Sequence, residues 1–183
     1  FVRRKDDYRR SAMDSLVLPG NAVMKQQEIP SLLPEDLEKY LRKAAEAPRR
    51  RYPKILHEPG AEFNEVFNFL MEDTYMQPHL HPHAEKIEKI HLVQGRLTVL
   101  IFDEEGKVIN RYSLGENELR CIEIPAFSWH TYVMQSDHVV TYETMVGQYD
   151  PKTWKTMASW APEEEDPHCH SYLNSLKENT TKD

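Results

Sequence analysis

Pro78-His79-Leu80-His81-Pro82-His83 is the stretch that decides how this 183-residue chain folds, because its histidines stand at alternate positions. Alternate residues of a β-strand point to one face of the sheet, so at least two of these imidazoles point the same way. Imidazole nitrogens that must lie about 2 Å from one ion need origins as close together as these. We therefore expect a strand here that supplies two ligands of one metal ion.

The segment that follows, Ile87 to Val93, supplies a carboxylate. If this segment forms a strand, Glu88, Ile90 and Leu92 share one face. When the two apolar side chains face the interior, Glu88 faces it as well. A buried carboxylate needs a cation or a good hydrogen-bond partner. A metal ion already held by two histidines would meet that need.

Residues 53–147 predict the fold class. Short β-rich runs alternate with turn signals there, which is typical of an all-β sandwich or barrel. Gly106 closes a predicted hairpin turn that needs a positive φ. A proline turn after Ile124 leads into a strand that His130 opens. The candidate strands are Lys54–His57, Glu65–Met71, Thr74–His79, Lys86–Val93, Arg96–Phe102, Val108–Ser113, Cys121–Ile124, Thr131–Gln135 and Val139–Val146.

The regions on either side of the predicted barrel are different in character. Residues 1–12 are basic and predict a flexible extension, and residues 13–52 are expected to hold a strand and a helix that pack on the barrel. The helix begins at Pro34, since proline and the carboxylates after it suit a first turn. Residues 148–183 predict helices and a tail. One helix begins at Asp150-Pro151, and another carries Tyr172, Leu173 and Leu176 on one face.

Composition excludes several classes of function. The formal net charge of −7 argues against nucleic acid as the main partner. The chain holds no run of about 18 apolar residues, so we expect no membrane span. Two cysteines, Cys121 and Cys169, are too few for a disulfide framework, which makes a reducing cytoplasm the simpler expectation.

Two motifs in these regions resemble those of the cupin superfamily. The first cupin motif is His, one residue, His, three or four residues, Glu, six residues, Gly. The second is Pro, one residue, Gly, two residues, His. The intervals from Glu88 to Gly95 and from Pro125 to His130 match. Phe127 stands where cupins usually have glycine, so the geometry of that turn is open.

The first motif leaves two pairs of histidines open. His81 and His83 fit the cupin interval to Glu88, whereas His79 and His81 require a loop two residues longer. We prefer the second pair, because Pro78-His79-Leu80-His81-Pro82 resembles the Pro-His-x-His-Pro signature of the WbuC family of cupin-fold metalloproteins. On this interpretation His79, His81, Glu88 and His130 bind the metal. Replacement of one of them by His83 or Glu85 is left open.

The WbuC resemblance covers most of the chain and implies a fold more strongly than an activity. It implies an all-β cupin jelly roll, the double-stranded β-helix barrel, with an N-terminal helix and C-terminal helices. It also implies a homodimer, for which a strand near Asn21–Met24 is the candidate contact, and an association with polysaccharide biosynthesis. The mixed nitrogen and oxygen ligands admit one divalent transition metal, Fe, Mn, Ni, Co or Zn.

Two classes of function remain open at this stage. In the first, the metal serves an enzyme that acts on a small polar metabolite, a sugar or sugar acid by analogy with the family, as an isomerase, epimerase or dioxygenase. In the second, the same site serves a non-catalytic cupin that binds or senses a small ligand. Arg49, Arg50, Arg51 and His57 either bind an acidic group of that ligand or have structural roles. Glu143 lies either beside the metal or on an exposed strand face.

Overall fold

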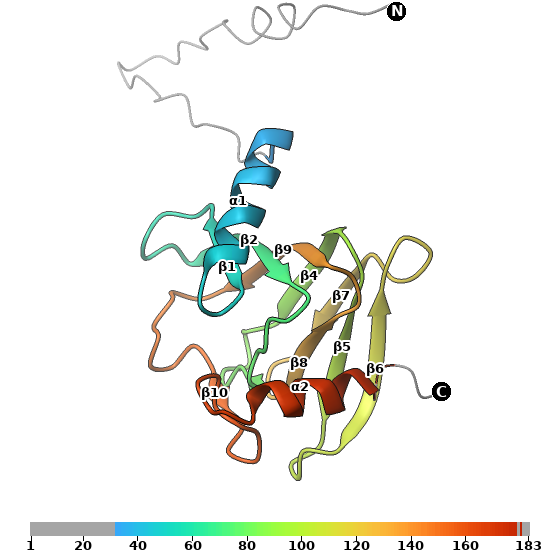
Figure 1. Ribbon diagram of the computed structural model, residues 1–183. Coiled ribbons are helices and arrows are strands. Elements are labelled where there is room, and N and C mark those ends of the chain that lie inside the picture. The colour runs from blue at the N-terminus through green and yellow to red at the C-terminus, as the bar shows by residue number, and fades with distance from the viewer. Residues whose placement is uncertain (1–31, 179, 181–183) are drawn as a thin grey trace, which may run out of the picture. The chain divides into compact units, whose positions relative to one another are not determined.

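The computed structural model describes residues 32–178 and 180, which form two helices and ten strands (Figure 1). The first half of this region contains α1 (Pro34–Glu46), β1 (Arg51–Ile55), β2 (Phe63–Met71), β3 (His79–Leu80), β4 (Glu88–Gln94) and β5 (Leu97–Phe102). The second half contains β6 (Val108–Leu114), β7 (Cys121–Ile124), β8 (Trp129–Met134), β9 (His138–Val146), β10 (Thr156–Met157) and α2 (Cys169–Glu178). The predicted extension at residues 1–12 and the predicted strand near Asn21–Met24 lie outside the described residues.

The strands form two antiparallel sheets, with the orders β1-β2-β9-β4-β7 and β10-β3-β8-β5-β6. Most consecutive strands, such as β4 and β5, belong to different sheets, whereas β1 pairs with β2 and β5 pairs with β6 within one sheet. The prediction of a fold dominated by strands is confirmed, since the described residues are mostly β, with two antiparallel sheets and two helices. The predicted closed barrel is not found among the described residues, because hydrogen bonding stops at the edge strands β1, β7, β10 and β6. One of these edges, β1, contains Pro53, which cannot donate to a further strand.

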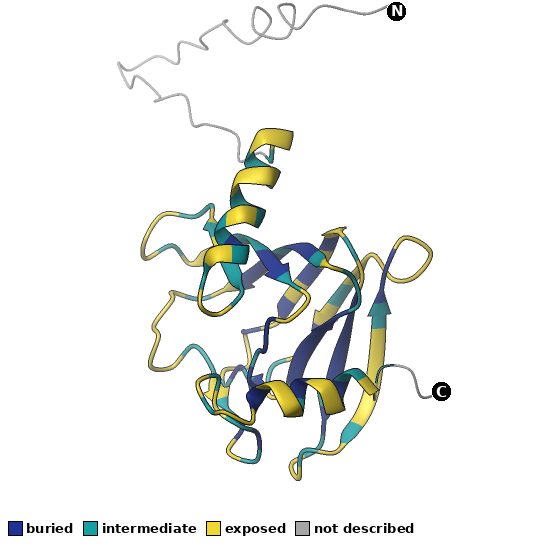
Figure 2. Cartoon of the chain, in the orientation of Figure 1, coloured by how far each residue is buried: buried dark blue, intermediate teal, exposed yellow. Residues whose placement is uncertain are grey.

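Alternation along the strands places the core between the two sheets. In β4 the side chains of Ile90 and Leu92 are buried, whereas those of Lys89 and His91 are exposed, as the sequence pattern predicts. Figure 2 shows the same contrast between the buried strands of the sandwich interior and β6, which is mostly exposed. The main core cluster contains Leu70, Ile90, Leu92, Leu97, Val99, Leu114, Ile124, Tyr132, Met134 and Val139.

The two helices cover the outer faces of different sheets. Tyr40 of α1 stacks on Phe69 of β2, with ring centroids 5.2 Å apart, and Ala44 is fully buried against the same strand. Leu176 of α2 packs with Val133 of β8 and Leu100 of β5. No helix in the described part of the chain combines the length and the hydropathy that crossing a membrane requires.

Two predicted elements are wrong. The helix expected from Asp150-Pro151 is a single turn, and β10 follows it and pairs with β3 (Thr156 with Leu80, Met157 with His79). The backbone groups of Thr156 and Met157, which would form hydrogen bonds within a helix, pair with β3 instead. The strand expected at Thr74–His79 is confined to His79–Leu80, since a turn at Thr74 and the missing amide hydrogen of Pro78 interrupt any ladder before it.

Candidate metal centre

Four buried side chains from three separate regions of the sequence meet between the sheets. His79 lies in β3 and His81 directly follows it, Glu88 begins β4, and His130 lies in β8. The ligand atoms of all four side chains lie within 4.8 Å of one another. The register between β3 and β8 explains the meeting of two of them, because His79 and His130 are directly opposite each other. His83 and Glu85 are exposed and lie outside this cluster.

Backbone carbonyls fix the orientation of each imidazole. The Nδ1 atom of His79 lies 3.0 Å from the carbonyl oxygen of Gln77, that of His81 lies 2.8 Å from Trp154, and that of His130 lies 2.8 Å from Ser128. A carbonyl oxygen can only accept a hydrogen bond, so Nδ1 carries the proton in all three rings. The Nε2 lone pairs are therefore directed to the cluster, which is the arrangement that metal-binding histidines require.

Glu88 lies between the histidines. Its Oε2 atom is 3.0 Å from Nε2 of His130 and 3.3 Å from Nε2 of His81, and its Oε1 atom accepts a hydrogen bond from the hydroxyl of Tyr132 at 2.7 Å. Burial acts to raise the pKa of Glu88, but the hydrogen bonds from His130 and His81 outweigh it and hold the pKa well below its usual value. Glu88 is thus an anionic group inside the protein.

The donor set fits a divalent transition metal. With Nδ1 already protonated, each contact between Nε2 and Glu88 needs either a second proton on the imidazole or a cation between the two groups. Burial lowers the pKa of His79 well below its usual value, so this ring is neutral and offers a bare Nε2. Three imidazole nitrogens and one carboxylate oxygen, all buried and converging, match the nitrogen and oxygen ligands of such ions.

A second carboxylate lies next to this cluster. Glu143 of β9 is buried and accepts hydrogen bonds from Nδ2 of Asn68 at 2.7 Å and from the hydroxyl of Thr141 at 2.6 Å. Burial raises the pKa of Glu143 to about 8, and the negative charge of Glu88 contributes to the rise. The sequence left open whether Glu143 faces the site or the solvent, and the structure places it inside.

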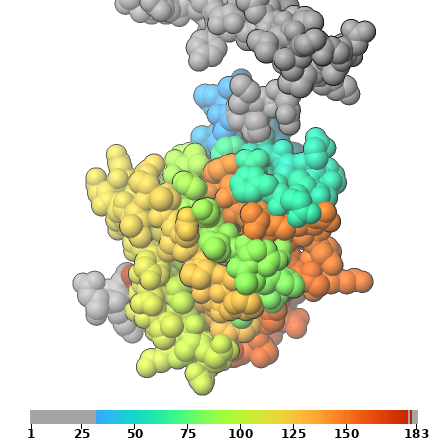
Figure 3. All heavy atoms as spheres, turned by 180° about the vertical axis from the view of Figure 1, so that it is seen from behind, coloured from blue at the N-terminus to red at the C-terminus, as the bar shows by residue number. Residues whose placement is uncertain are grey.

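A small cavity of about 70 Å³ reaches the cluster at Glu88. It is lined by Asn64, Val66, Glu88, Glu143, Thr144, Met145 and Trp154. Figure 3 shows the molecule from behind, where the segment before β2 (teal) lies beside the segment after β9 (orange). The amide of Gly147 joins these two segments by donating a hydrogen bond to the carbonyl oxygen of Glu62 at 2.7 Å. The roles of Trp154 and Tyr132 were not predicted, because each depends on contacts with strands distant in the sequence.

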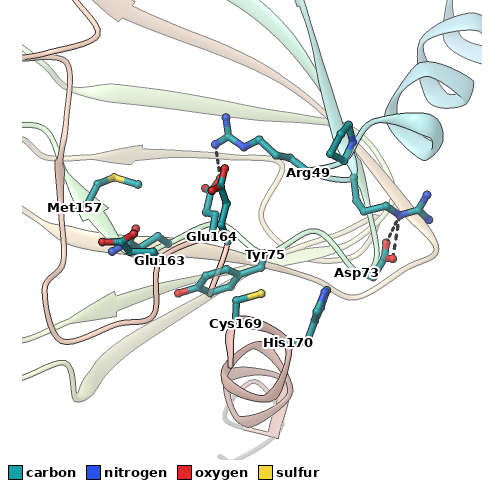
Figure 4. A pocket seen from close by; sticks show the side chains of 12 residues that line it. Arg49, Asp73, Tyr75, Met157, Glu163, Glu164, Cys169 and His170 are labelled. Atoms are coloured by element: carbon teal, nitrogen blue, oxygen red, sulfur yellow. Dashed lines mark hydrogen bonds and ion pairs between the residues drawn. The ribbon is translucent and has the colours of Figure 1, made fainter. Parts of the chain in front are cut away.

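A larger cavity of about 640 Å³ lies elsewhere, and none of the four clustered residues lines it (Figure 4). Arg49 and Arg51 both bind the carboxylate of Glu164 at its rim, at 2.5 Å each, and Arg50 binds Asp73 at 2.9 Å. The three arginines, whose role the sequence left open, thus have acidic partners within the protein. His57 accepts a hydrogen bond from the Glu65 amide at 2.9 Å, between β1 and β2, and lines neither cavity.

A family model described as Domain of unknown function (DUF6016) matches residues 32–114, which is less than half of the chain. A comparison with curated proteins gives no match. Among solved structures, the chain is similar to a cupin 2 conserved barrel domain protein from Rhodopseudomonas palustris, with 16% identity and a TM-score of 0.46 over 62% of this chain and 70% of that one.

Two further structures have comparable similarity. The cupin domain of Schizosaccharomyces pombe Cnp3 has 12% identity and a TM-score of 0.43, over 54% of this chain and 62% of that one. The capsular polysaccharide assembling protein CapF from Staphylococcus aureus has 17% identity and a TM-score of 0.46, over 58% of this chain and 32% of that one. The structural neighbours of this chain therefore include cupin domain proteins.

Proposed function

We propose that this protein is a metal-dependent cupin enzyme in which His79, His81, Glu88 and His130 hold one divalent transition metal. One observation carries the proposal. Three imidazoles, each with its proton fixed on Nδ1 by a backbone carbonyl, converge with one buried carboxylate, and Nε2 of His81 and of His130 lies within 3.3 Å of it. Without a cation, His81 and His130 must each take a second proton inside the protein, or their Nε2 lone pairs face the carboxylate lone pairs; both arrangements are costly.

Glu143 favours an enzyme over a binding protein. A bound metal ion would supply Lewis acidity and so polarise a substrate oxygen or activate water. A general acid or base works best when its pKa lies near the operating pH, and the pKa of Glu143 is about 8. Asn68 and Thr141 hold its carboxyl group in place against the cavity wall. Glu143 would therefore hold or release a proton at its carboxyl group beside the reacting molecule.

The remaining residues of the site position these groups. Tyr132 fixes the orientation of the Glu88 carboxylate through its hydroxyl, and Trp154 both orients His81 through its backbone and walls the cavity with its ring. An isomerase or epimerase is the reaction class we rank first, ahead of a dioxygenase, because it uses a proton-transferring carboxyl group directly. Membership of the WbuC family and a sugar or sugar-acid substrate remain part of this proposal and rest on the sequence resemblance.

Metal analysis of matched histidine variants tests the ligand set. The full chain, purified without added metal, is expected to carry about one transition-metal ion per chain. His81→Ala and His130→Ala should lose it, whereas His83→Ala, which changes an exposed histidine of the same segment, should retain it. Equal metal content in His81→Ala and His83→Ala, with both variants folded by circular dichroism, would refute the ligand assignment.

A second experiment separates the reaction classes. The metal-loaded protein is incubated with sugars, sugar acids and short carboxylic acids while product formation and oxygen uptake are followed. Conversion without oxygen uptake would indicate an isomerase, and substrate-dependent uptake would indicate an oxygenase. Glu143→Gln should keep the metal and lower turnover by about a hundredfold or more, the usual contribution of a general acid or base. No conversion of any compound would favour the non-catalytic binding cupin.

A further inference from the structure

We propose that the ligand of this site is a small monoanion, and that Val66, Met145 and Trp154 limit the group that reaches the metal to about three or four non-hydrogen atoms. This inference rests on the proposed function, because it takes the four-residue cluster to hold a divalent ion. It goes further by naming the ligand's size and charge. It also identifies the side chains that select the ligand, none of which is among the four proposed metal ligands.

The size limit follows from the cavity beside Glu88. Its volume is about 70 Å³, and a protein cavity of about 150 Å³ holds benzene, which has six non-hydrogen atoms, so this cavity has room for about three. Formate and azide, with three non-hydrogen atoms each, are of this size, and acetate is at the limit. A hexose or its acid has about four times as many atoms and could enter by one end at most. The cavity therefore selects a smaller ligand than the sequence resemblance implies.

Two walls of the cavity are parts of the sandwich interior. Val66 of β2 lies opposite Glu143 of β9, and Met145 of β9 lies opposite Asn64 of β2. The two pairs are two positions apart on each strand, so all four side chains lie on one face of this strand pair. The Asn64 amide donates hydrogen bonds to the carbonyl oxygens of Gly147 at 2.6 Å and Met145 at 3.3 Å. These bonds tie the wall to the end of β9, so the space between Val66 and Met145 is set by the sheet.

The third wall, Trp154, is held from several sides. Its amide donates to the carbonyl oxygen of Asp150 at 2.8 Å, and its own carbonyl oxygen accepts from His81. Its ring lies 3.7 Å from the Nζ atom of Lys86, a cation–π contact, and 5.2 Å from the ring of Tyr149. A side chain with this many partners does not swing aside cheaply, so we expect the cavity to keep its small size when a ligand binds.

Charge selects an anion for this cavity. A divalent ion, one carboxylate from Glu88 and three neutral imidazoles together leave one positive charge in the protein interior. Lys155 adds to it, because its half-buried ammonium group, whose strongest charge partner is Glu164, also interacts electrostatically with Glu88 and His79. An uncompensated buried charge is costly, and a bound monoanion would neutralise the cluster. A small neutral molecule of equal size would leave that cost in place.

Cobalt substitution of the full chain tests the inference through a spectroscopic signal that needs no activity. The visible absorption of protein-bound Co(II) changes when its coordination changes, so formate and azide are titrated against gluconate and methanol. Formate and azide should shift the spectrum at millimolar concentrations, whereas gluconate and methanol should leave it unchanged at tenfold higher concentrations. Gluconate binding as tightly as formate would overturn the size limit, and methanol binding as tightly would overturn the charge requirement.

Variants of β9 and β2 then test which residues of the cavity wall set the size limit for the ligand. Met145→Ala should admit butyrate with at least tenfold tighter binding than the wild type shows, while Val146→Ala, on the opposite face of the same strand and 41% exposed, should not. Val66→Leu should have the reverse effect and weaken acetate binding more than azide binding. Unchanged selectivity in variants that retain the Co(II) spectrum would overturn the assignment. A wild-type chain that takes up no Co(II) would overturn both the metal site and this inference.

Discussion

The interior of the sandwich has an apolar half and a polar half, and the same strands build both. In β9 the inward side chain of Val139 belongs to the apolar core, and Glu143, further along the same face, belongs to the site. In β4 Leu92 is a core residue and Glu88 is a candidate ligand. Alternation decides which face is buried, and the identity of the buried residues decides what each half does. The apolar half stabilises the fold, and the polar half carries the candidate site.

Metal removal should have the largest effect on the free energy of unfolding, and it changes only the polar half of the interior. A ligand present at a thousand times its Kd stabilises the folded state by about 4 kcal/mol, so a chelator should lower the free energy of unfolding by about that amount. Urea denaturation of metal-loaded and chelated full-length protein measures the difference. His83→Ala should show the same difference and His81→Ala should show none. A free energy of unfolding that does not depend on metal would contradict the proposed site.

A cavity in the apolar half should have the next largest effect and leave the site intact. Leu97→Ala removes a fully buried side chain of the main core cluster and should lower the free energy of unfolding by about 3 kcal/mol. Ile109→Ala is the control, since its side chain is 51% exposed and should change stability by less than about 0.5 kcal/mol. Both variants should bind metal as the wild type does. Loss of metal binding in Leu97→Ala would show that the two halves are not independent.

Tyr132 lies where the two halves meet, and its substitution separates the contribution of its ring to the apolar half from that of its hydroxyl to the polar half. Tyr132→Phe keeps the ring in the apolar cluster and removes the hydroxyl that donates to Glu88. Removal of a group that orients a metal ligand typically lowers metal affinity by about 10- to 100-fold, which is about 1.4 to 2.7 kcal/mol. Competition with a chromogenic chelator measures this change. Wild-type affinity in Tyr132→Phe would mean that the hydroxyl does not position Glu88.

The smallest expected effect is a gain in stability at the turn before His130. Phe127 has a φ of 62°, in the left-handed region that strains a residue other than glycine. Its side chain is 57% exposed, so burial of the ring does little to offset that strain. Phe127→Gly relieves that strain and should stabilise the protein by about 0.5 kcal/mol, the net of strain relief and the greater freedom of the unfolded chain. Phe127→Ala keeps the strain and should give no gain. Thermal denaturation of both variants distinguishes these outcomes.

Local patterns predicted the parts of the site that depend on alternation. The inward position of Glu88 follows from Ile90 and Leu92, and Gly106 has the positive φ of 83° that its hairpin turn requires. Alternation left His79 with His81 and His81 with His83 both open, and only the family resemblance favoured the first pair. The physical reason for that pair is the pairing of β3 with β8, which joins segments about 50 residues apart. No local pattern contains that register.

Local signals were misleading where a strand pair used the same backbone. Asp150-Pro151 begins a turn as a helix start would, but the backbone of Thr156 and Met157 pairs with β3. Cys121 begins the predicted strand Cys121–Ile124 and is exposed, because it lies at the outward-facing start of edge strand β7. Phe127 departs from the cupin motif in residue type, yet it keeps the backbone conformation that glycine adopts easily.

The hydrogen bond from His81 to the carbonyl oxygen of Trp154 has a practical consequence for the design of shortened proteins. A fragment that stops at the end of β9 would contain every metal-binding side chain proposed here. It would lack the carbonyl oxygen of Trp154, which keeps the proton of His81 on Nδ1. It would also lack the Trp154 side chain, which lines the cavity beside Glu88. The smallest piece of this chain that can be expected to bind metal with native selectivity therefore extends at least through Trp154.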